Sequence, residues 1–397
     1  MRFVSGGIAM HGTDSRVERK LDEIRAFIDE VHGGTLHAKR VNSLAGATLG
    51  VMEGASLAVG VIGHSLAQAR GRVTKHAIKQ VDRLLSNEGI DTWNSFAHWV
   101  PQRVGERKSI WVAMDWTDYD ADNQSTLALN LITDHGRATP LIWLTMWKDE
   151  LTGQRNAIED ACLHRLAEVL PKGVDVTILA DRGFGDRKLF AFLKELGFGF
   201  NIRFRANILV TDERGECRPA AGWVGKGGRA RKLRHARLTA DADETVGAVV
   251  CVRAKGMKDA WCLAVSDGEA PTSRIVKAYA KRWSIEPSFR DTKDLRFGMG
   301  LDTCRIGDPM RRDRLLLLNA FAVVLLTLLG AAGESLGFDR MLKSNTSPKR
   351  THSLFRQGCM WFDLIPNMPE DRLTALMGRY GDILQQEKSF NGLFSVV

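Results

Sequence analysis

The sequence predicts a mixed α/β protein whose central region combines a β-sheet with helices and whose two ends are helical. Three observations carry this prediction. Apolar residues recur at helical spacing from Asp14 to about Trp99, short apolar runs typical of buried strands begin near Ser109, and helical periodicity returns at Ser273. Hydrophobic residues make up 44 % of the 397 residues, which is enough to bury a large core.

Residues 1–104 are predicted to form a helical domain that binds DNA. Segment 74–85 places Lys75, Lys79 and Arg83 on a different side from its apolar residues. The recognition helix of a helix-turn-helix has this pattern, but so does any solvated helix. Both interpretations therefore stay open for this segment.

Residues 105–337 are predicted to form a central domain that contains a β-rich insertion at residues 206–268. Before the insertion, the pattern predicts a mixed sheet with strands near 110–114, 125–133, 140–146, 174–180 and 200–204 and with helices near 155–170 and 187–196. Inside it, strands are predicted at 245–254 and 260–266. Helices resume from residue 273 to 330, and residues 338–397 are predicted to be mostly helical.

The net charge of the chain and the motifs that it lacks narrow the range of possible functions. The net charge of +9 and the pI of about 9.3 favour a polyanionic partner, nucleic acid or an anionic membrane surface, although a merely basic enzyme stays open.

The apolar run 315–329 is short and contains Asn319 and Thr327, so it predicts a buried core helix rather than a membrane span. The sequence contains no GxxxxGK[ST], HExxH or GxSxG motif. Its six cysteines form no CxxC pair and its N-terminus lacks a signal-peptide pattern, so we expect a reducing cytoplasm.

Two predicted strands end in an aspartate, IWVAM before Asp115 and TILA before Asp181. In open α/β sheets, ligands bind beyond the carboxyl ends of strands, so each carboxylate could bind a metal or act as a base. Taken singly, either aspartate could equally serve a turn or cap a helix.

A third carboxylate belongs to a polar helical stripe. Tyr279, Arg282, Glu286 and Lys293 stand at offsets 0, 3, 7 and 14, which places them on one side of a helix. A buried stripe would be apolar, so this one is expected to line solvent or a polyanion, or else to be an ordinary solvated face. Pro287 predicts a kink or restart near Glu286.

Three carboxylates from distant segments suit hard cations. Mg²⁺ takes oxygen ligands, and two such ions can assist an in-line phosphoryl transfer without a histidine or cysteine nucleophile. A basic run, residues 225–237, contains no acid and suits phosphate contacts, although it could also be a flexible basic loop. Its candidate DNA-binding residues are Lys226, Arg229, Arg231, Lys232 and Arg234.

The segment YAKRWSIEPSFRDTK, from Tyr279 to Lys293, resembles the Y-(2)-R-(3)-E-(6)-K signature of the insertion-sequence family 4 transposases, which are bacterial DDE enzymes. IWVAMDWTD and ILADRGFGD resemble the family's segments with the first and second catalytic aspartates, and FRDTKDLRFGMGL and the apolar helix after it are also similar. The resemblance covers residues 109–337; residues 1–104 resemble the family only in being helical and basic.

This resemblance implies a ribonuclease-H-like catalytic core with a β-rich insertion. It implies that Asp115, Asp181 and Glu286 are catalytic and bind two Mg²⁺ ions, with Mn²⁺ as a substitute. Tyr279, Arg282 and Lys293 would contact phosphates of the transposon end, and Trp283, or Trp261 in the insertion, could stack on an unpaired base.

The implied function is cut-and-paste transposition of DNA between terminal inverted repeats and target DNA. The enzyme would act as a homodimer in the cytoplasm near the nucleoid, without ATP or a membrane. Two alternatives remain. One is another ribonuclease-H-like enzyme, such as a nuclease or junction resolvase, and the other is a DNA-binding protein whose catalytic site has decayed.

Overall fold

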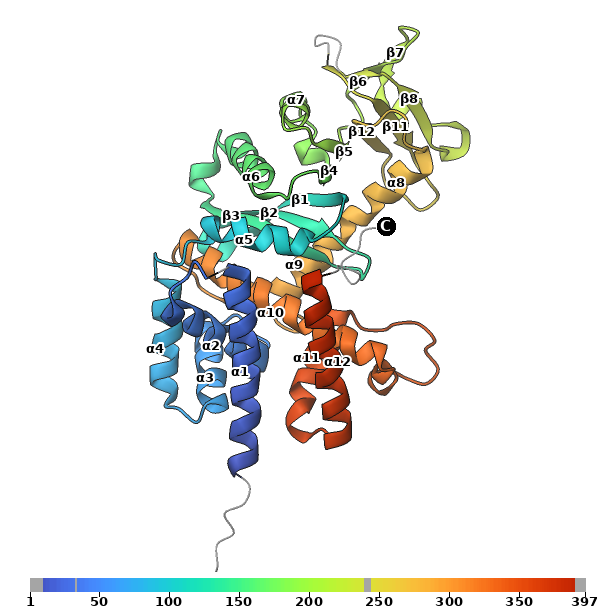
Figure 1. Ribbon diagram of the computed structural model, residues 1–397. Helices are drawn as coiled ribbons and strands as arrows, with labels where there is room; N and C mark the ends of the chain where they lie inside the picture. The colour runs from blue at the N-terminus through green and yellow to red at the C-terminus, as the bar shows by residue number, and fades with distance from the viewer. Residues whose placement is uncertain (1–9, 33, 239–243, 390–397) are drawn as a thin grey trace, which may run out of the picture. The chain divides into compact units, whose positions relative to one another are not determined.

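The computed structural model describes residues 10–32, 34–238 and 244–389 (Figure 1). These residues divide into two compact units. The helical unit contains residues 10–32, 34–105, 119–122 and 289–389, and the sheet unit contains 106–118, 123–238 and 244–288.

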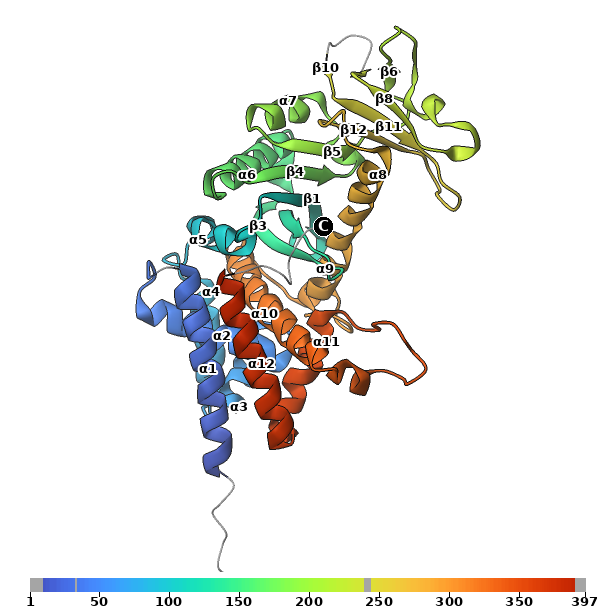
Figure 2. The same cartoon turned by 45° about the vertical axis from the view of Figure 1, so that its right-hand side comes forward.

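The helical unit is built around one apolar helix, α10 (Pro309–Ser335), which packs against α2, α11 and α12 (Figures 1 and 2). The other helices of this unit are α1 (Met10–His32), α2 (Ala38–Gly54), α3 (Val59–Ala69), α4 (Thr74–Leu85), α5 (Thr92–Val104), α11 (Leu354–Leu364) and α12 (Glu370–Ser389). By length and composition α10 could cross a membrane, but 94 % of its most apolar window is buried inside the protein. The prediction of a buried core helix at residues 315–329 is therefore confirmed.

A buried ion pair ties α10 to a short segment that the helical unit takes from the middle of the chain. Arg312 is fully buried, and its guanidinium donates to Asp122 Oδ2 at 2.5 Å and lies 3.8 Å from the centre of the Tyr119 ring. A buried charge is stable only when an opposite charge compensates it, so this pair favours one position for residues 119–122.

The sheet unit contains an eight-stranded mixed sheet in the order β3-β2-β1-β4-β5-β12-β11-β8. Its strands are β1 (Ser109–Tyr119), β2 (Gln124–Ile132), β3 (Ala138–Trp147), β4 (Asp175–Ala180), β5 (Gly199–Arg203), β8 (Arg231–Arg234), β11 (Ala248–Val252) and β12 (Trp261–Val265). β1, β4 and β5 are parallel neighbours, and the β12-β11-β8 pairs are antiparallel. A second sheet has the order β10-β9-β6-β7, with β6 (Leu209–Thr211), β7 (Cys217–Pro219), β9 (Arg237–Leu238) and β10 (Glu244–Thr245).

Helices cover both faces of the large sheet (Figure 2). They are α6 (Arg155–Val169), α7 (Arg187–Glu195) and α8 (Thr272–Lys281). On β5, Phe200 stacks on Phe190 of α7 with ring centres 4.9 Å apart, and the next residue, Asn201, donates to the Ile275 carbonyl of α8 at 2.8 Å. Successive strand residues point to opposite faces, so α7 and α8 lie on opposite sides of the sheet.

The predicted β-rich insertion is confirmed, and part of it belongs to the large sheet. Its strands β12, β11 and β8 continue the large sheet beyond β5 rather than forming an independent domain. β1 also runs five residues beyond Met114, where its sequence turns polar and half-exposed. Apolar patterns report burial rather than backbone hydrogen bonding, so the strand was expected to end too early.

The Arg312–Asp122 pair gives a stability prediction. Replacing Arg312 with Ala leaves the Asp122 carboxylate buried without its partner, so we expect a loss of about 3 kcal/mol in the free energy of unfolding. Urea denaturation of the full chain measures this. The matched control is Arg25→Ala, which removes an exposed pair with Asp22 and should cost about 0.5 kcal/mol or less. Equal losses in the two variants would contradict the structural role of Arg312.

Candidate active site

The first two candidate carboxylates lie at one edge of the sheet. In the parallel register of β1 and β4, Met114 is paired with Ala180, and Asp115 and Asp181 are the residues that follow. Asp181 comes just after β4 and keeps an extended backbone, with φ −77° and ψ 175°. Both predicted strands are therefore confirmed, and they are parallel neighbours in the sheet.

These carboxylates also share one face of the sheet. Ala113 is paired with Leu179, and Leu179 with Asn201, whose side chain bonds to α8. Paired residues point to the same face and residues two apart along a strand do too. Asp115 and Asp181 therefore point to the face that α8 covers.

Arg282 lies between two of the three candidate carboxylates. It is only 2 % exposed, and its Nη1 donates to Asp115 Oδ2 and its Nη2 to Glu286 Oε1, each at 3.3 Å. The guanidinium thus joins the polar stripe after α8 to the end of the apolar part of β1. Among the residues described here, its Nε is buried without a hydrogen-bond partner, which leaves one donor for a ligand.

Burial and neighbouring charges change the acidity of Asp115. Burial raises its pKa to about 6, the Arg282 guanidinium opposes that rise, and the charges of Asp181 and Glu286 add to it. The pKa stays raised although Arg282 is in contact, because the burial of the carboxyl outweighs the effect of the guanidinium. An added cation would be stabilised at this place.

The helix that carries the polar stripe is interrupted, as Pro287 predicts. α8 ends at Lys281, a 3₁₀ turn covers Arg282–Ser284, and α9 (Ile285–Lys293) places Pro287 in its first turn. Proline lacks an N–H and its ring clashes with the preceding turn, so the break falls just before it. The stripe of four polar residues is therefore only approximate.

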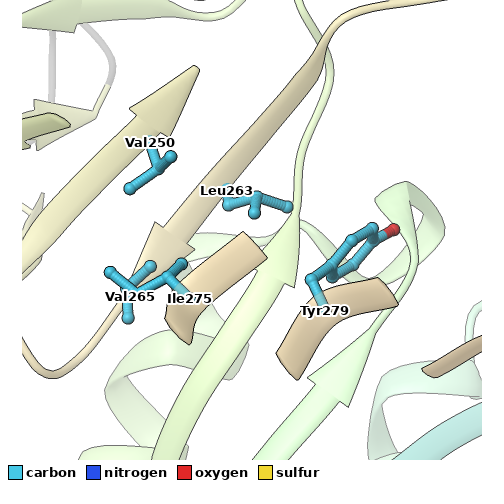
Figure 3. Close-up of a cluster of buried hydrophobic side chains, with 5 residues drawn as sticks. All are labelled: Val250, Leu263, Val265, Ile275 and Tyr279. Carbon is cyan, nitrogen blue, oxygen red and sulfur yellow. The ribbon is translucent and has the colours of Figure 1, made fainter. Parts of the chain in front are cut away.

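The expectation of an open face is wrong for part of this stripe. Tyr279 is 1 % exposed and packs with Val250, Leu263, Val265 and Ile275, while its hydroxyl oxygen lies on the side away from Val250 (Figure 3). Arg282 is buried as well, and its guanidinium pairs there with Asp115 and Glu286. Only Glu286, with a side chain 45 % exposed, lines solvent in this group.

The two candidate stacking tryptophans differ in exposure. Trp283 is 49 % exposed and its ring centre lies 5.4 Å from the Arg282 guanidinium. Trp261 packs edge-on against Tyr279 with ring centres 4.9 Å apart and belongs to the border of the apolar cluster. Trp261 is thus a core aromatic here, whereas Trp283 has a ring that a ligand can reach.

Lys293, the last residue of the stripe, belongs to the helical unit. Its ammonium lies 3.2 Å from Asp302 Oδ1 and 4.7 Å from the centre of the Tyr119 ring. An ion pair and a cation–π contact together restrict the position of a side chain that is otherwise very mobile.

Part of the basic run forms an edge strand. Lys226 and Arg229 are exposed beside a short 3₁₀ turn (Lys226–Gly228), and Arg231, Lys232 and Arg234 lie on β8. Lys232 donates to the Ala270 carbonyl at 2.9 Å, and Arg234 pairs with Glu269 at 3.2 Å. β8 is the last strand of the large sheet, so a row of cations marks its edge.

A second group of cations was missed by sequence reasoning. A cavity of about 640 Å³ in the sheet unit is lined by four arginines and a lysine, with one aspartate, Asp259. The cations are Arg182, Arg203, Arg205, Arg253 and Lys258. The cavity is lined by four separate segments, so no basic run in the sequence indicates it. The position of Arg182 directly after Asp181 was the one available signal. Because Arg182 directly follows Asp181 in the chain, the cavity begins beside one of the candidate carboxylates.

The acidic site fits a divalent cation in its chemistry. Asp115 Oδ1 accepts from the Trp116 N–H at 2.9 Å and Asp181 Oδ1 from the Gly183 N–H at 3.2 Å, so each carboxylate keeps further lone pairs for a ligand. Carboxylate oxygens are the ligands that Mg²⁺ and Mn²⁺ prefer. In the described parts of the chain, no three His, Cys, Asp or Glu side chains are close enough to bind one ion. Arg282 instead provides the positive charge between Asp115 and Glu286.

Comparison with known proteins agrees with this geometry. A family model described as transposase DDE domain matches residues 113–325, a span that includes all three carboxylates. No curated protein matches the chain. The mixed sheet with flanking helices, together with this match, confirms the predicted ribonuclease-H-like fold class. Membership in insertion-sequence family 4 stays a prediction.

The raised pKa of Asp115 predicts how stability depends on pH. The folded pKa of about 6 exceeds the usual 3.8, so the contribution of this carboxyl to stability is full below about pH 4 and is lost as pH rises through 6. In EDTA, Asp115→Asn should therefore stabilise the protein by roughly 1 to 2 kcal/mol near pH 7 and by almost nothing near pH 4. Thermal melts across this range measure the difference. A gain of the same size at both pH values would show that Asp115 does not titrate as stated.

Proposed function

We propose, from the premise that this chain belongs to the transposase DDE domain family, that it moves DNA by cut-and-paste transposition. As a DDE transposase the protein is a nuclease and strand transferase that acts on DNA and uses divalent metal ions. The finer proposal is that it belongs to insertion-sequence family 4, cuts at terminal inverted repeats, and joins the freed 3′ ends to target DNA.

One observation carries the proposal. Two aspartates follow paired residues of parallel strands and point to the same face, and a buried arginine links one of them, Asp115, to Glu286. A site that serves only as a turn or cap would not gather acidic groups from three distant segments around a buried cation.

Asp115, Asp181 and Glu286 would hold two Mg²⁺ ions, with Mn²⁺ as a substitute. Such ions, when bound, supply the charge that activates an attacking hydroxyl and stabilises the leaving oxygen. The protein's own contribution is to keep the carboxylates on one face and to desolvate Asp115, whose raised pKa favours pairing with a cation.

Arg282, Tyr279 and Lys293 would hold DNA phosphates. Arg282 already has an unused Nε donor, and its two ion pairs would loosen when other cations neutralise the carboxylates. Tyr279 is braced by the apolar cluster, so its hydroxyl would be held in one direction (Figure 3). Trp283, being exposed, is the better candidate for stacking on an unpaired base.

The basic cavity and the cationic edge strand β8 would bind the DNA backbone beyond the reacting phosphate. Five cations around one cavity create a strong positive potential, and phosphate contacts of this kind make binding depend on salt. The helices of residues 1–104 would bind the terminal repeats. Pairing of two ends would need a homodimer, and the reaction would need neither ATP nor a membrane, in the cytoplasm near the nucleoid.

Two alternatives predict different products. A ribonuclease-H-like nuclease or junction resolvase would cut branched or unspecific DNA and would not join ends. A DNA-binding protein with a decayed site would bind terminal repeats without cutting. The presence of all three carboxylates, two of them paired with Arg282, argues against decay, and the family match argues against a resolvase.

The direct test uses DNA that carries the candidate terminal repeats bounding the gene, incubated with the full chain and Mg²⁺. We expect 3′ nicks at the repeat ends and joined products with target DNA. Asp115→Ala should reduce cleavage at least a thousandfold and leave repeat binding within about twofold, because the carboxylate acts on the metal ions rather than on the DNA. Sequencing gels and mobility shifts measure the two effects.

Asp118→Ala is the matched control, since Asp118 is an exposed aspartate of the same strand, paired with Lys148 at 3.4 Å. It should keep wild-type cleavage. Loss of repeat binding in Asp115→Ala would instead indicate a structural role for Asp115.

Neutralising the basic edge tests the phosphate contacts. Replacing Arg229, Arg231, Lys232 and Arg234 with Gln should weaken DNA binding and lower the slope of log affinity against log salt by about 2 to 3. Titrations at several salt concentrations measure the slope. An unchanged slope would exclude these residues from the interface.

A further inference from the structure

A turn in the helical unit exposes two large apolar side chains. The 295–297 turn lies between α9 and a short 3₁₀ turn (Leu301–Thr303), and it consists of Leu295, Arg296 and Phe297. Leu295 is 71 % exposed and Phe297 is 58 % exposed, and Leu295 exceeds every other large hydrophobic residue in the described part of the chain. Large apolar side chains that are exposed to water this close together are typical of a binding surface.

Hydrogen bonds to the backbone N–H groups hold the 295–297 turn in one conformation. Asp294 Oδ1 accepts the N–H groups of Arg296 at 2.9 Å and Phe297 at 2.6 Å, and the Asp294 carbonyl accepts those of Gly298 at 3.1 Å and Gly300 at 3.0 Å. The Met299 N–H donates to the Asp291 carbonyl at 2.8 Å. Five consecutive N–H groups are thus bonded, so little conformational entropy is left to lose on binding.

The base of the turn is anchored in the core of the unit. Met299 is 1 % exposed and its carbonyl accepts the N–H of Leu57 at 2.8 Å. A Cβ at Gly298 would lie 2.4 Å from the Asp291 carbonyl oxygen, so only glycine lets the chain return this tightly. The exposed side chains therefore stand on a fixed base rather than on a long loop.

Arginines precede, interrupt and follow the apolar tip in the sequence. Arg296 separates Leu295 from Phe297, and its guanidinium lies 5.2 Å from the centre of the Phe297 ring. Arg290 is exposed, and the side chain of Arg305 is 73 % exposed. The turn thus combines positive charge with exposed apolar side chains, and proteins that kink DNA bind it with arginine and insert apolar wedges between its base steps.

We propose that the 295–297 turn is a DNA wedge: Leu295 and Phe297 insert between base pairs while Arg296 and its neighbours bind the flanking phosphates. This inference rests on the proposed function for its DNA substrate, but it concerns a surface outside the acidic site. Inserted apolar side chains unstack a base step and bend the duplex, and an arginine beside them offsets the repulsion between phosphates drawn together. Insertion needs no metal and no cleavage.

The test measures bending of a duplex of about 40 base pairs that carries the candidate repeat and a dye at each end, in EDTA. Wild type and Asp115→Ala should both bring the ends closer, as seen by energy transfer. Leu295→Ala with Phe297→Ala should abolish the bend and weaken binding roughly tenfold, the size expected when stacking on a base step is lost. Phe297→Leu should keep most of the bend, because a leucine can also wedge a base step.

Leu364→Ala is the matched control, since Leu364 is another exposed apolar residue of the helical unit, at 46 % exposure. It should bend DNA like wild type. A double variant that bends DNA normally overturns the wedge, and so does one that loses only self-association. Bending by a wild-type protein that cannot cut would support the wedge and defeat the proposed transposition. Normal cutting without any bend would overturn the wedge and support the proposed transposition.

Discussion

The candidate active site depends on one buried arginine. Arg282 is almost free of solvent and donates to both Asp115 and Glu286, so it links the edge of the sheet to the helical segment that follows α8. Removing both carboxylate partners would leave the buried guanidinium uncompensated, which costs several kcal/mol. The same constraint explains the local backbone: the break at Arg282–Ser284 turns the chain so that the guanidinium faces the sheet, and Pro287 keeps the break in place.

The charge balance around Arg282 connects structure to activity. Burial and the charges of Asp181 and Glu286 together outweigh the Arg282 guanidinium, so the pKa of Asp115 remains raised to about 6. The site is therefore stable with Arg282 in place and still attracts more positive charge. A cation that binds the carboxylates would release Arg282, whose Nε already has no partner among the described residues, to a phosphate. Metal binding and DNA binding would thus strengthen each other. The metal ions would neutralise the carboxylates, and a DNA phosphate would pair with the Arg282 guanidinium that the carboxylates release.

Much of this was predictable from the sequence, because strand ends and helix breaks leave local signals. The strands before Asp115 and Asp181, the kink near Pro287 and the buried helix at residues 315–329 all followed from apolar runs and proline. What could not be predicted depends on contacts between distant segments. Helical spacing suggested an open face at Tyr279 and Arg282, but only the fold shows an apolar cluster and two carboxylates covering them. The basic cavity draws on four segments, so no single stretch of sequence contains it.

The most direct measurement is the anomalous scattering of crystals of the full chain soaked with Mn²⁺, with and without repeat DNA. The account predicts manganese peaks within coordination distance of Asp115, Asp181 and Glu286, with the Arg282 guanidinium moved off at least one carboxylate and, in the complex, next to a phosphate. Manganese bound elsewhere, or Arg282 unmoved between Asp115 and Glu286 in a crystal that cuts DNA, would contradict it.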